Sequence, residues 1–374
     1  MKQRLRFAWF VTPHGFGHAA RTAAIVEALA SRLPELEVEL WTSVPRWFFA
    51  ESLTVGYRYR ELACDVGLVQ RSPVEEDLPA SLAALAGFWR AADEGRISEV
   101  AAAVAASGAT CVVADIAPFG LAVARAAGLP SVLVENFTWD WIYEPLAASE
   151  PGFAEWVERL RGTSGDTAGE TALHLQLEPC CRPAAGARAV PPVARAPRQS
   201  REEILARLAI PPTDAVVLVS LGGVEHRLAS LGPLAGVPGT TFVIPGASAE
   251  ERREGNLRLL PHHSPVHHPD LVAAADAVVG KLGYSTVAEV VSAGCRVLYV
   301  PRPGFRESAV LERYVGERLP AVAISFAELE SGGWVGRLPL LLDRPRPPAL
   351  ATRGAAVAAD LIAGWWEAGG QRSR

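Results

Sequence analysis

Two short glycine-containing stretches carry the residues of this chain that are best suited to chemistry. The first is Thr12-Pro13-His14-Gly15-Phe16-Gly17-His18, in which two histidines flank a Gly-Phe-Gly turn. An imidazole with a pKa near ~6.5 can take up a proton at neutral pH, so either His14 or His18 could act as a general base. A lone histidine is more often structural, but two histidines around one turn favour a chemical role for at least one.

The second stretch is Gly280-Lys281-Leu282-Gly283-Tyr284-Ser285-Thr286-Val287-Ala288-Glu289. It closes a predicted strand and opens a predicted helix. Glycines let backbone approach a ligand closely, and a helix N-terminus offers free N–H groups and a positive dipole end to phosphate. Glu289 could accept hydrogen bonds from a ribose diol. Such a turn is also common in α/β proteins that bind no ligand there.

A buried strand and an amphipathic helix must position the first stretch. The apolar run Phe7–Val11 is typical of a buried parallel strand. The helix predicted after it turns Ala and Leu side chains inward and Arg21, Glu27 and Arg32 outward. The histidines therefore follow the carboxyl end of a strand, where open α/β sheets bind ligands.

The length and the order of elements indicate two domains, because 374 residues exceed one comfortable core. Strands alternate with helices in both halves, which predicts two parallel sheets. We expect a domain at 1–180, a proline-containing linker at 181–200, a second domain at 201–350, and a C-terminal helix at 351–374 that packs across the domain junction.

The predicted strands are Leu5–Thr12, Val38–Thr42, Thr110–Ala114 and Ser131–Val134, then Ala215–Ser220, Thr240–Ile244, Ala277–Val279, Arg296–Val300 and Ala321–Ile324. The predicted helices are His18–Ser31, Leu78–Ala106 and Pro118–Ala127, then Arg201–Leu208, Thr286–Ala293, Ser308–Arg318 and Thr352–Trp366.

Composition limits the class of protein. Hydrophobic residues make up 49% and charged residues 21%, with a formal charge of −5, so a globular protein is predicted and nucleic acid is not an expected partner. No apolar run approaches the ~20 residues that span a bilayer, and the opening segment does not fit a secretory signal. We expect a cytoplasmic protein. The five cysteines lack metal-binding spacing, which favours reduced thiols.

Three further loops in the second half suit ligand binding. Gly222 and Gly223 follow a strand and could form a backbone nest for a diphosphate, or a plain turn. His267 could border a nucleotide base, and Arg306 and Glu307 follow the strand after the glycine-rich helix. The histidines at 262, 263, 267 and 268 invite a metal interpretation, but they lack a partner carboxylate, so no metal site is predicted.

Two aromatic clusters have competing interpretations. The rings of Phe137, Trp139, Trp141 and Tyr143 follow the strand Ser131–Val134 and could stack on an acceptor, although such rings are more often core. The run at 47–49 could dock on a membrane, but without a basic cluster around it packing is favoured, and a lipid acceptor stays open.

Together these motifs resemble the nucleotide-sugar glycosyltransferases of the GT-B fold, in which two Rossmann-like parallel-sheet domains face each other across a cleft. Gly283–Glu289, with Ala293-Gly294 and Pro301, resembles the donor segment of the peptidoglycan N-acetylglucosaminyltransferase and of the UDP-glycosyltransferases. Val11–Arg21, Glu135–Tyr143 and Gly280–Tyr284 are similar to the glycosyltransferase-like N-terminal domain of plant L-arabinokinase and its bacterial relatives.

The resemblance implies roles for residues of the first half. Gly17-His18 matches the position of the general base, and Asp115 matches the aspartate that orients it. Asp115 could instead cap the helix near Pro118. His14 is a rival base or a contact to the departing phosphate. His14, Gly15, Phe16, Gly17, Asn136, Trp139 and Trp141 would form the acceptor side.

The donor side implied by the resemblance consists of Gly222, Gly223, His267, Lys281, Gly283, Tyr284, Ser285, Thr286, Glu289, Arg306 and Glu307. The chain departs from the plant-type pattern at Lys281, which stands in place of a histidine, and at Arg306-Glu307, which stands in place of an acidic-Gln pair. Because no Asp-x-Asp occurs, the helix end, Lys281 and backbone amides would stabilise the leaving diphosphate without a metal.

The expected activity is therefore transfer of a hexosyl or N-acetylhexosaminyl group from a nucleoside-diphosphate sugar, UDP favoured, to the hydroxyl of a small molecule, glycan or lipid. No cofactor is expected, and a histidine base favours inversion at the anomeric carbon. The alternatives are an epimerase or hydrolase acting on the same donor, and a non-catalytic protein that senses the nucleotide sugar.

Overall fold

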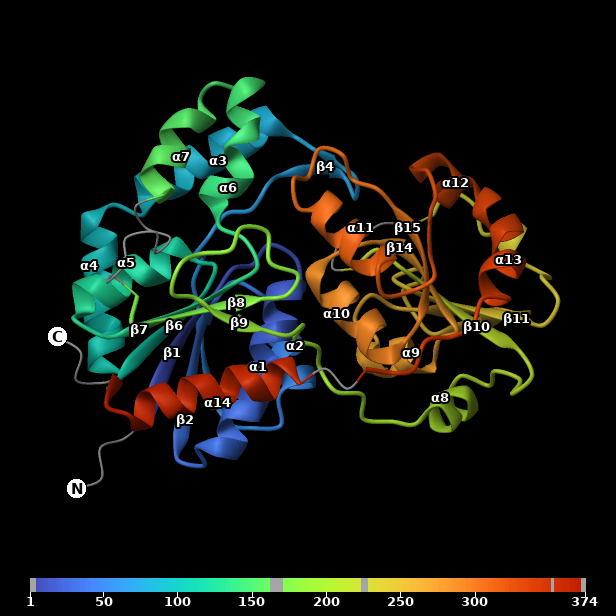
Figure 1. Cartoon of the computed structure of the whole chain (residues 1–374), viewed down its shortest axis with the longest axis horizontal. Coiled ribbons are helices and arrows are strands. Elements are labelled where there is room, and N and C mark those ends of the chain that lie inside the picture. Colours follow the sequence, from blue (N-terminus) through green and yellow to red (C-terminus); the bar gives the residue numbers. More distant parts are fainter. Residues whose placement is uncertain (1–4, 162–170, 223–227, 351–352, 371–374) are drawn as a thin grey trace. The chain divides into compact units, whose positions relative to one another are not determined.

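The computed structural model describes residues 5–161, 171–222, 228–350 and 353–370. The chain forms two compact units: residues 1–70, 76–193 and 353–374 belong to the first, and residues 71–75 and 194–352 to the second. The boundary after Val193 lies inside the predicted linker 181–200, whose first part is folded, because residues 188–190 form a strand of the first sheet. Figure 1 labels the elements.

The first unit contains a seven-stranded sheet in the order β3-β2-β1-β6-β7-β8-β9, and each strand runs parallel to its neighbours in this sheet. The strand order reverses direction between β1 and β6, since the chain adds β2 and β3 on one side and β6 to β9 on the other. Its strands are β1 Leu5–Val11, β2 Leu36–Thr42, β3 Tyr57–Glu61, β6 Cys111–Asp115, β7 Ser131–Glu135, β8 Leu173–Leu177 and β9 Arg188–Val190.

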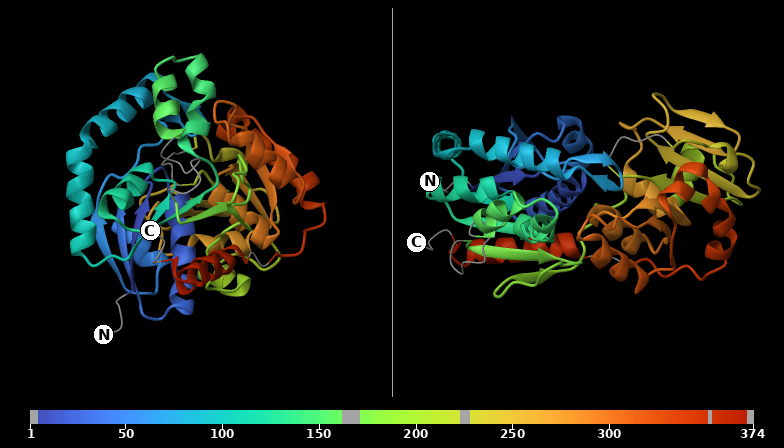
Figure 2. Two further views of the ribbon diagram at one scale, coloured as in Figure 1. Left: turned by 60° about the vertical axis from the view of Figure 1, so that its left-hand side comes forward. Right: turned by 90° about the horizontal axis from the view of Figure 1, so that it is seen from above.

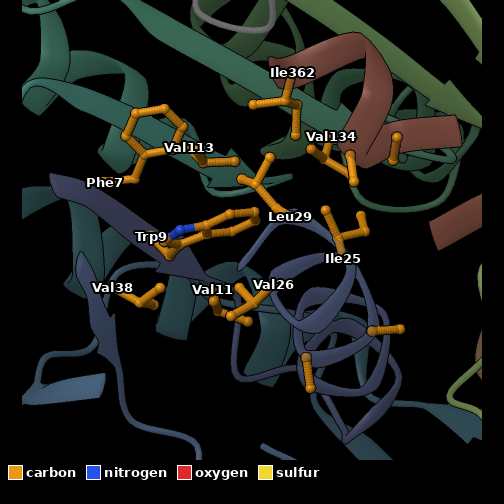
Figure 3. Close-up of a cluster of buried hydrophobic side chains, with 14 of the residues drawn as sticks. Phe7, Trp9, Val11, Ile25, Val26, Leu29, Val38, Val113, Val134 and Ile362 are labelled. Atoms are coloured by element: carbon orange, nitrogen blue, oxygen red, sulfur yellow. The ribbon is translucent and has the colours of Figure 1, made fainter. Parts of the chain in front are cut away.

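Helices cover both faces of this sheet. On one face α1 (Gly17–Arg32) lies beside α14 (Gly354–Glu367), as Figures 1 and 2 show, so the C-terminal helix belongs to the first unit. Phe7, Trp9 and Val11 of β1 point to this face and pack with Leu29 of α1 and Ile362 of α14 (Figure 3). Burial of these apolar side chains on two neighbouring helices supplies the main stabilisation of the unit.

The opposite face of the first sheet is covered by α5 (Pro118–Ala127), whose Phe119 contacts Phe10 of β1 with ring centroids 6.4 Å apart. Phe88 of α3 also contacts Phe119, at 6.0 Å. The unit's remaining elements are α2 Arg46–Ser52, β4 Gln70–Ser72, β5 Glu75–Glu76, α3 Leu78–Ala91, α4 Glu94–Ala106, α6 Trp139–Tyr143, η1 Pro145–Ala148 and α7 Phe153–Arg161; parts of β4 and β5 belong to the second unit.

Two predictions about the helices of this unit are wrong. The single helix predicted at 78–106 is two helices, α3 and α4, because Asp93 adopts an extended conformation and its side chain accepts a hydrogen bond from the Arg96 amide at 2.9 Å. Arg21 was expected to face outward, but the structure buries it, with 3% of its surface exposed, since it faces a buried carboxylate.

The second unit contains a seven-stranded sheet in the order β12-β13-β11-β10-β14-β15-β16. Neighbouring strands of this sheet are parallel, except that β12 is antiparallel to β13. Here too the order reverses direction next to the first strand, between β10 and β14. The strands are β10 Ala215–Ser220, β11 Thr240–Pro245, β12 Arg252–Glu254, β13 Leu257–Leu260, β14 Ala277–Lys281, β15 Arg296–Val300 and β16 Ala321–Ala323.

Two apolar cores lie on the two faces of the second sheet. One contains side chains of α8 (Arg201–Arg207), α9 (His268–Ala274), α10 (Tyr284–Ala293) and α11 (Ser308–Gly316). The other is centred on Phe242 and the fully buried Trp334, 5.9 Å apart. The elements on that side are η2 Gly232–Leu234, α12 Phe326–Ser331, η3 Gly333–Arg337 and α13 Leu338–Leu342.

Two general findings concern the whole chain. All five cysteines are free thiols, as the sequence predicted. Within the described ranges, none of the helices combines the length and the apolar character that crossing a bilayer requires.

Gly280 is the tightest backbone contact at the reversal point of the second sheet. It has φ +155°, and a Cβ added there would lie 1.8 Å from the carbonyl oxygen of Ser220 on the neighbouring strand. We expect Gly280→Ala to destabilise the protein by about 3 kcal/mol, because backbone atoms cannot move aside as a flexible side chain can. Chemical denaturation measures this.

The matched control is Gly316→Ala in the same unit, where nothing lies within 4 Å of the added Cβ. That variant should retain the stability of the unmodified protein. An equally stable Gly280→Ala protein would show that the β10–β14 contact is looser than the structure has it.

Candidate functional site

His18 and Asp115 meet at the reversal point of the first sheet. His18 lies in the first turn of α1, directly after the β1 loop, and Asp115 is the last residue of β6. The Nδ1 atom of His18 lies 2.9 Å from Oδ1 of Asp115, and both residues are buried. Asp115 does not cap the following helix, whose N-cap position is Ala117. The structure thus brings together the two residues predicted to form the catalytic pair.

Arg21 completes this pair in a way the sequence did not predict. Its Nε donates to Oδ2 of Asp115 at 2.7 Å, and a terminal nitrogen donates to Oδ1 of the same carboxylate. The other terminal nitrogen donates to the Asn136 side-chain oxygen. Thr22 adds a hydroxyl donor to Oδ2 of Asp115 at 3.0 Å. His18, Arg21 and Thr22 are spaced i, i+3, i+4 and therefore share one helix face, a signal the sequence did contain.

Electrostatics in this cluster favours an ionised aspartate and a neutral histidine. Burial by itself would raise the pKa of Asp115, but the charge and hydrogen bonds of Arg21, with those of His18, hold that pKa below its usual value. The pKa of His18 is lowered, first by burial and then by the positive charge of Arg21, against the opposing effect of Asp115.

These charge states favour one tautomer of His18. An ionised carboxylate can only accept, so the 2.9 Å contact to Asp115 is a hydrogen bond when Nδ1 of His18 carries the proton. A nitrogen of Arg21 lies 2.9 Å from the same Nδ1 atom, and its positive charge disfavours further protonation of the ring. The lone pair is then on Nε2, which makes no hydrogen bond to any part of the chain that the structure describes.

Trp139, which was predicted for the acceptor side, contacts a second buried carboxylate, Asp65, which the sequence did not single out. Asp65 accepts hydrogen bonds from the indole N–H of Trp139 at 2.7 Å and from the Val66 amide at 2.8 Å. Burial raises its pKa to about 7, against the effect of those hydrogen bonds. Its loop also carries Gly67, which packs directly against His14: an added Cβ would lie 1.8 Å from the imidazole.

The two tryptophans predicted for the acceptor side are buried. Trp139 is 2% exposed and Trp141 8% exposed. Trp139 stacks on Tyr143 at 5.5 Å and contacts the rings of Phe137 and His14 edge-on. Protein atoms therefore cover these rings, which agrees with the core interpretation and gives no support to stacking on an acceptor. Phe16, at the centre of the Gly-Phe-Gly turn, packs on Phe48 at 4.9 Å.

The predicted donor residues gather at the reversal point of the second sheet. Gly222 follows β10 with φ +69°, and a Cβ added to it would lie 3.6 Å from Cε of Lys281, at the end of β14. Gly283 is the N-cap of α10. Because glycine has no side chain, Gly283 cannot cap the backbone N–H groups of the first turn of this helix. Tyr284, Ser285 and Thr286 form the half-buried first turn. Gly223 lies outside the described residues.

Lys281 is the cation of this site. Burial, followed by the charge of Arg302, lowers its pKa to about 7, while Glu307 acts in the opposite direction. Arg302 is 6% exposed, lies over the Phe305 ring at 3.2 Å, and is 4.0 Å from Glu307. Arg306 is half-buried in the same loop. Two neighbouring basic groups with little solvent access suit an anionic ligand.

Glu289 is buried and already engaged by protein. One carboxylate oxygen lies 3.0 Å from Nδ1 of His268, and the other is 3.3 Å from Arg195 and 3.4 Å from the Ser285 hydroxyl. Burial by itself raises the pKa of Glu289, but the hydrogen bond and charge of His268, together with Arg195, lower it to about 2. A carboxylate held in this way is ionised and has a fixed orientation.

A chain of polar contacts connects Glu289 with the loop after β10. Nε2 of His268 lies 3.3 Å from the Ser220 hydroxyl, which accepts a hydrogen bond from the Gly222 amide at 3.3 Å. His268, Ser220 and Arg195 were not among the predicted site residues. They come from three separate segments, so no local pattern in the sequence could connect them.

His267 lies beside this network at the N-cap of α9. Burial, then the charges of Arg195 and Arg198, lowers its pKa to about 4, so it is neutral at physiological pH. Among the described residues, no group of three or more His, Cys, Asp or Glu side chains is arranged to hold a metal ion.

This architecture defines a class. Two α/β units, each with a parallel sheet whose order reverses beside its first strand, and each with polar residues at that point, form the GT-B fold. The resemblance noted from the sequence motifs is confirmed at the level of the fold.

Comparisons with known proteins give the same class. Among solved structures, a UDP-glucosyltransferase from Polygonum tinctorium matches with a TM-score of 0.64 and 17% identity, over 98% of this chain and 100% of that one. The glycotransferase of kitacinnamycin matches with a TM-score of 0.63 and 19% identity, over 96% and 98%. No family model matches the chain.

A curated relative is more similar in sequence. L-arabinokinase of Arabidopsis thaliana is 28% identical over 350 residues, which cover 89% of this chain and 32% of that protein. The chain therefore spans about a third of the length of this relative.

The ionised Glu289 generates a testable pH dependence. Its pKa in the folded state, about 2, lies below the unfolded value, so its stabilisation is complete above about pH 5 and is lost as the pH falls towards 2. We expect Glu289→Gln to lower the free energy of unfolding by about 3 kcal/mol at pH 7, and this difference from the unmodified protein to shrink between pH 5 and pH 3. Urea unfolding at several pH values measures it.

Glu254→Gln, at an exposed position on β12, is the control and should behave as the unmodified protein at every pH. A difference for Glu289→Gln that stays constant down to pH 3 would contradict an ionised, paired Glu289.

Proposed function

We propose that this protein transfers a sugar from a nucleoside-diphosphate sugar to a hydroxyl acceptor, with His18 as the general base. The observation that carries the proposal is the buried His18–Asp115 contact of 2.9 Å at the reversal point of the first sheet. In the second unit, the residues at the reversal point of the sheet would bind an anion. UDP is the favoured nucleotide, and hexosyl or N-acetylhexosaminyl transfer is the favoured type of reaction.

The donor half would bind the nucleotide through its phosphates and ribose. The uncapped first turn of α10, the Gly222 backbone and Lys281 offer N–H groups and positive charge to the diphosphate. Glu289 would accept hydrogen bonds from the ribose hydroxyls, as an ionised carboxylate whose orientation His268 fixes. Arg306 and Glu307 would contact the sugar. This set supports leaving-group stabilisation that requires no metal.

The chemical step is a direct displacement. Nε2 of His18 takes the proton of the acceptor hydroxyl as that oxygen forms a bond to the anomeric carbon. The bond from the anomeric carbon to the β-phosphate oxygen breaks, and its electron pair leaves with the diphosphate. Asp115 accepts the Nδ1 hydrogen bond throughout and stabilises the imidazolium that forms. One displacement of this kind inverts the anomeric configuration.

The first test separates binding from transfer. A thermal-shift screen of nucleoside diphosphates and their sugars identifies the donor, since a ligand at ~100 times its Kd adds about 2.7 kcal/mol of stability. With that donor, His18→Ala should lower the transfer rate by ~10²- to 10⁴-fold and leave donor affinity within about twofold. His174→Ala removes another histidine of the same unit that also contacts a carboxylate, Glu135, and should keep full activity.

Three outcomes are informative. Transfer at the unmodified rate by His18→Ala would remove the base assignment. Donor binding without any acceptor-dependent product would favour a sensor, and loss of the sugar without an acceptor would favour a hydrolase or epimerase. The anomeric configuration of the product, measured by NMR, tests inversion.

Lys281 gives nucleotide binding a pH dependence with a defined sign. Its pKa of about 7 means that it loses its charge as the pH rises above 7, whereas a bound phosphate favours the charged form. The affinity for UDP should therefore fall between pH 7 and pH 9, by up to ~10-fold per pH unit. The diphosphate of UDP keeps a constant charge in this range, because its last proton titrates near ~6. Calorimetry measures the affinity.

Lys281→Arg keeps the charge at all these pH values and should bind UDP with an affinity that does not change with pH. Lys281→Gln should bind more weakly and also without pH dependence. A pH-dependent Lys281→Gln protein would assign the titration to another group.

A further inference from the structure

Arg21 lies one helical turn after His18 and contacts both residues of the proposed catalytic pair, His18 and Asp115. It is 3% exposed. Its Nε donates to Oδ2 of Asp115, and one terminal nitrogen donates to Oδ1 of the same carboxylate. That terminal nitrogen also lies 2.9 Å from Nδ1 of His18. The other terminal nitrogen donates to the side-chain oxygen of Asn136. A guanidinium has a planar set of donors, so these contacts fix both its position and its orientation.

The partner atoms of Arg21 are themselves fixed. Asn136 follows β7, and its amide nitrogen donates to the Leu177 carbonyl at 2.8 Å, which orients the side-chain oxygen towards Arg21. Asp115 ends β6 and receives a further hydrogen bond from Thr22. Arg21 therefore joins α1 to two neighbouring strand ends, and a small displacement of the helix would break several hydrogen bonds at once.

We infer that Arg21 is a positioning residue that keeps His18 an uncharged base with its proton on Nδ1. The inference rests on the proposed function of His18. It deepens that function, because it assigns to a third side chain the protonation state that a base requires.

The physical reason is the charge balance around the imidazole. A carboxylate beside an imidazole raises the pKa of that imidazole and so favours imidazolium, and an imidazolium cannot accept the proton of an acceptor. Arg21 supplies the positive charge that Asp115 needs, so the ring does not have to. The pKa of His18 is lowered in this direction, first by burial and then by the charge of Arg21.

No other described charge in direct contact with His18 replaces Arg21. On its own helix the charged group is Arg21, and from β6 it is Asp115. From the β7 end come the uncharged Asn136 and the ring of Phe137, 6.2 Å from the imidazole. The charge of Asp115 raises the pKa of Asp65, in the loop after β3, but Asp65 is absent from the groups that shift the pKa of His18.

The same contact helps the site return to its starting state. After transfer the ring carries the acceptor's proton on Nε2 and keeps its proton on Nδ1. Its positive charge then lies beside the guanidinium of Arg21, which repels it. The proton on Nε2 therefore passes readily to solvent or buffer, and the neutral base is restored.

The experiment is a pH titration of His18 by NMR in the full chain labelled with 15N-histidine, with the His18 signal assigned from its loss in His18→Gln. In the unmodified protein we expect the proton on Nδ1 and a titration midpoint below ~6.5. Arg21→Met should raise the midpoint by about one pH unit or more. Arg21→Lys keeps the charge and should remain close to the unmodified protein.

Arg32→Met is the matched control, because Arg32 is an exposed arginine on the same helix, 2.6 Å from an exposed aspartate, Asp360. It should leave the midpoint unchanged. With a known donor and acceptor, the acidic limb of kcat/KM should move to higher pH in Arg21→Met by the same amount as the midpoint.

Two results would overturn the inference: a neutral His18 with its proton on Nε2, or an Arg21→Met midpoint equal to that of the unmodified protein. If Arg21→Met does not fold, the inference is still tested by the tautomer of His18 in the unmodified protein and by the His18 titration in Arg21→Lys. The titration needs no substrate. If transfer requires His18 but the His18 titration midpoint is the same in Arg21→Met as in the unmodified protein, the inference fails and the proposed function stands. If the midpoint rises in Arg21→Met but His18→Ala transfers sugar at the unmodified rate, the proposed function fails and the effect of Arg21 on His18 stands.

Discussion

The organisation of the first unit depends on neutralising one buried carboxylate. Asp115 ends a fully buried strand, where an isolated negative charge would be strongly disfavoured. Arg21 and Thr22 of α1 supply the donors that it needs, and Asn136 holds Arg21 from the next strand end. The helix is thereby fixed against the sheet at the point where the strand order reverses. This interaction also brings His18 into contact with Asp115.

The second unit solves the same problem with different residues. Its buried carboxylate, Glu289, lies on a helix rather than at a strand end, and the partners of this carboxylate are His268 and Arg195. The site also contains Lys281. Burial and the positive charge of Arg302 lower the pKa of this lysine to about 7. One unit thus holds an imidazole whose pKa is lowered, and the other holds a lysine whose pKa is lowered. The proposed transfer reaction would use both groups.

Much of this could be predicted from the sequence because it depends on local pattern. The runs at Phe7–Val11 and Ala215–Ser220 are continuously apolar, which is typical of strands covered on both faces, and both are central strands in the structure. The glycine at 280 was expected where a strand gives way to a helix, and the structure shows a backbone contact that excludes a side chain there. The family resemblance implied that His18 pairs with Asp115, and parallel sheets bring such strand ends to one edge.

The errors have equally definite causes. A helical wheel treats arginine as a surface residue, and it therefore placed Arg21 outside although a buried acid 94 positions away holds it inside. The run at 78–106 has no proline or glycine signal strong enough to separate two helices. Asp93 interrupts the helix because its side chain accepts a hydrogen bond from the Arg96 amide and so caps the start of α4. The residues at 188–190 have a coil-like composition, yet the edge of β8 gives them hydrogen-bond partners.

The sequence by itself determined the class of fold and the two strand-to-helix turns that carry His18 and Lys281, because each depends on residues close together in the chain. Only the tertiary structure decided the protonation of these groups. Asp65, Arg21, Arg195 and His268 act on partners far along the chain, and the charge of a buried group is set by the solvent it loses and the neighbours it gains. Those neighbours exist only once the two sheets have formed.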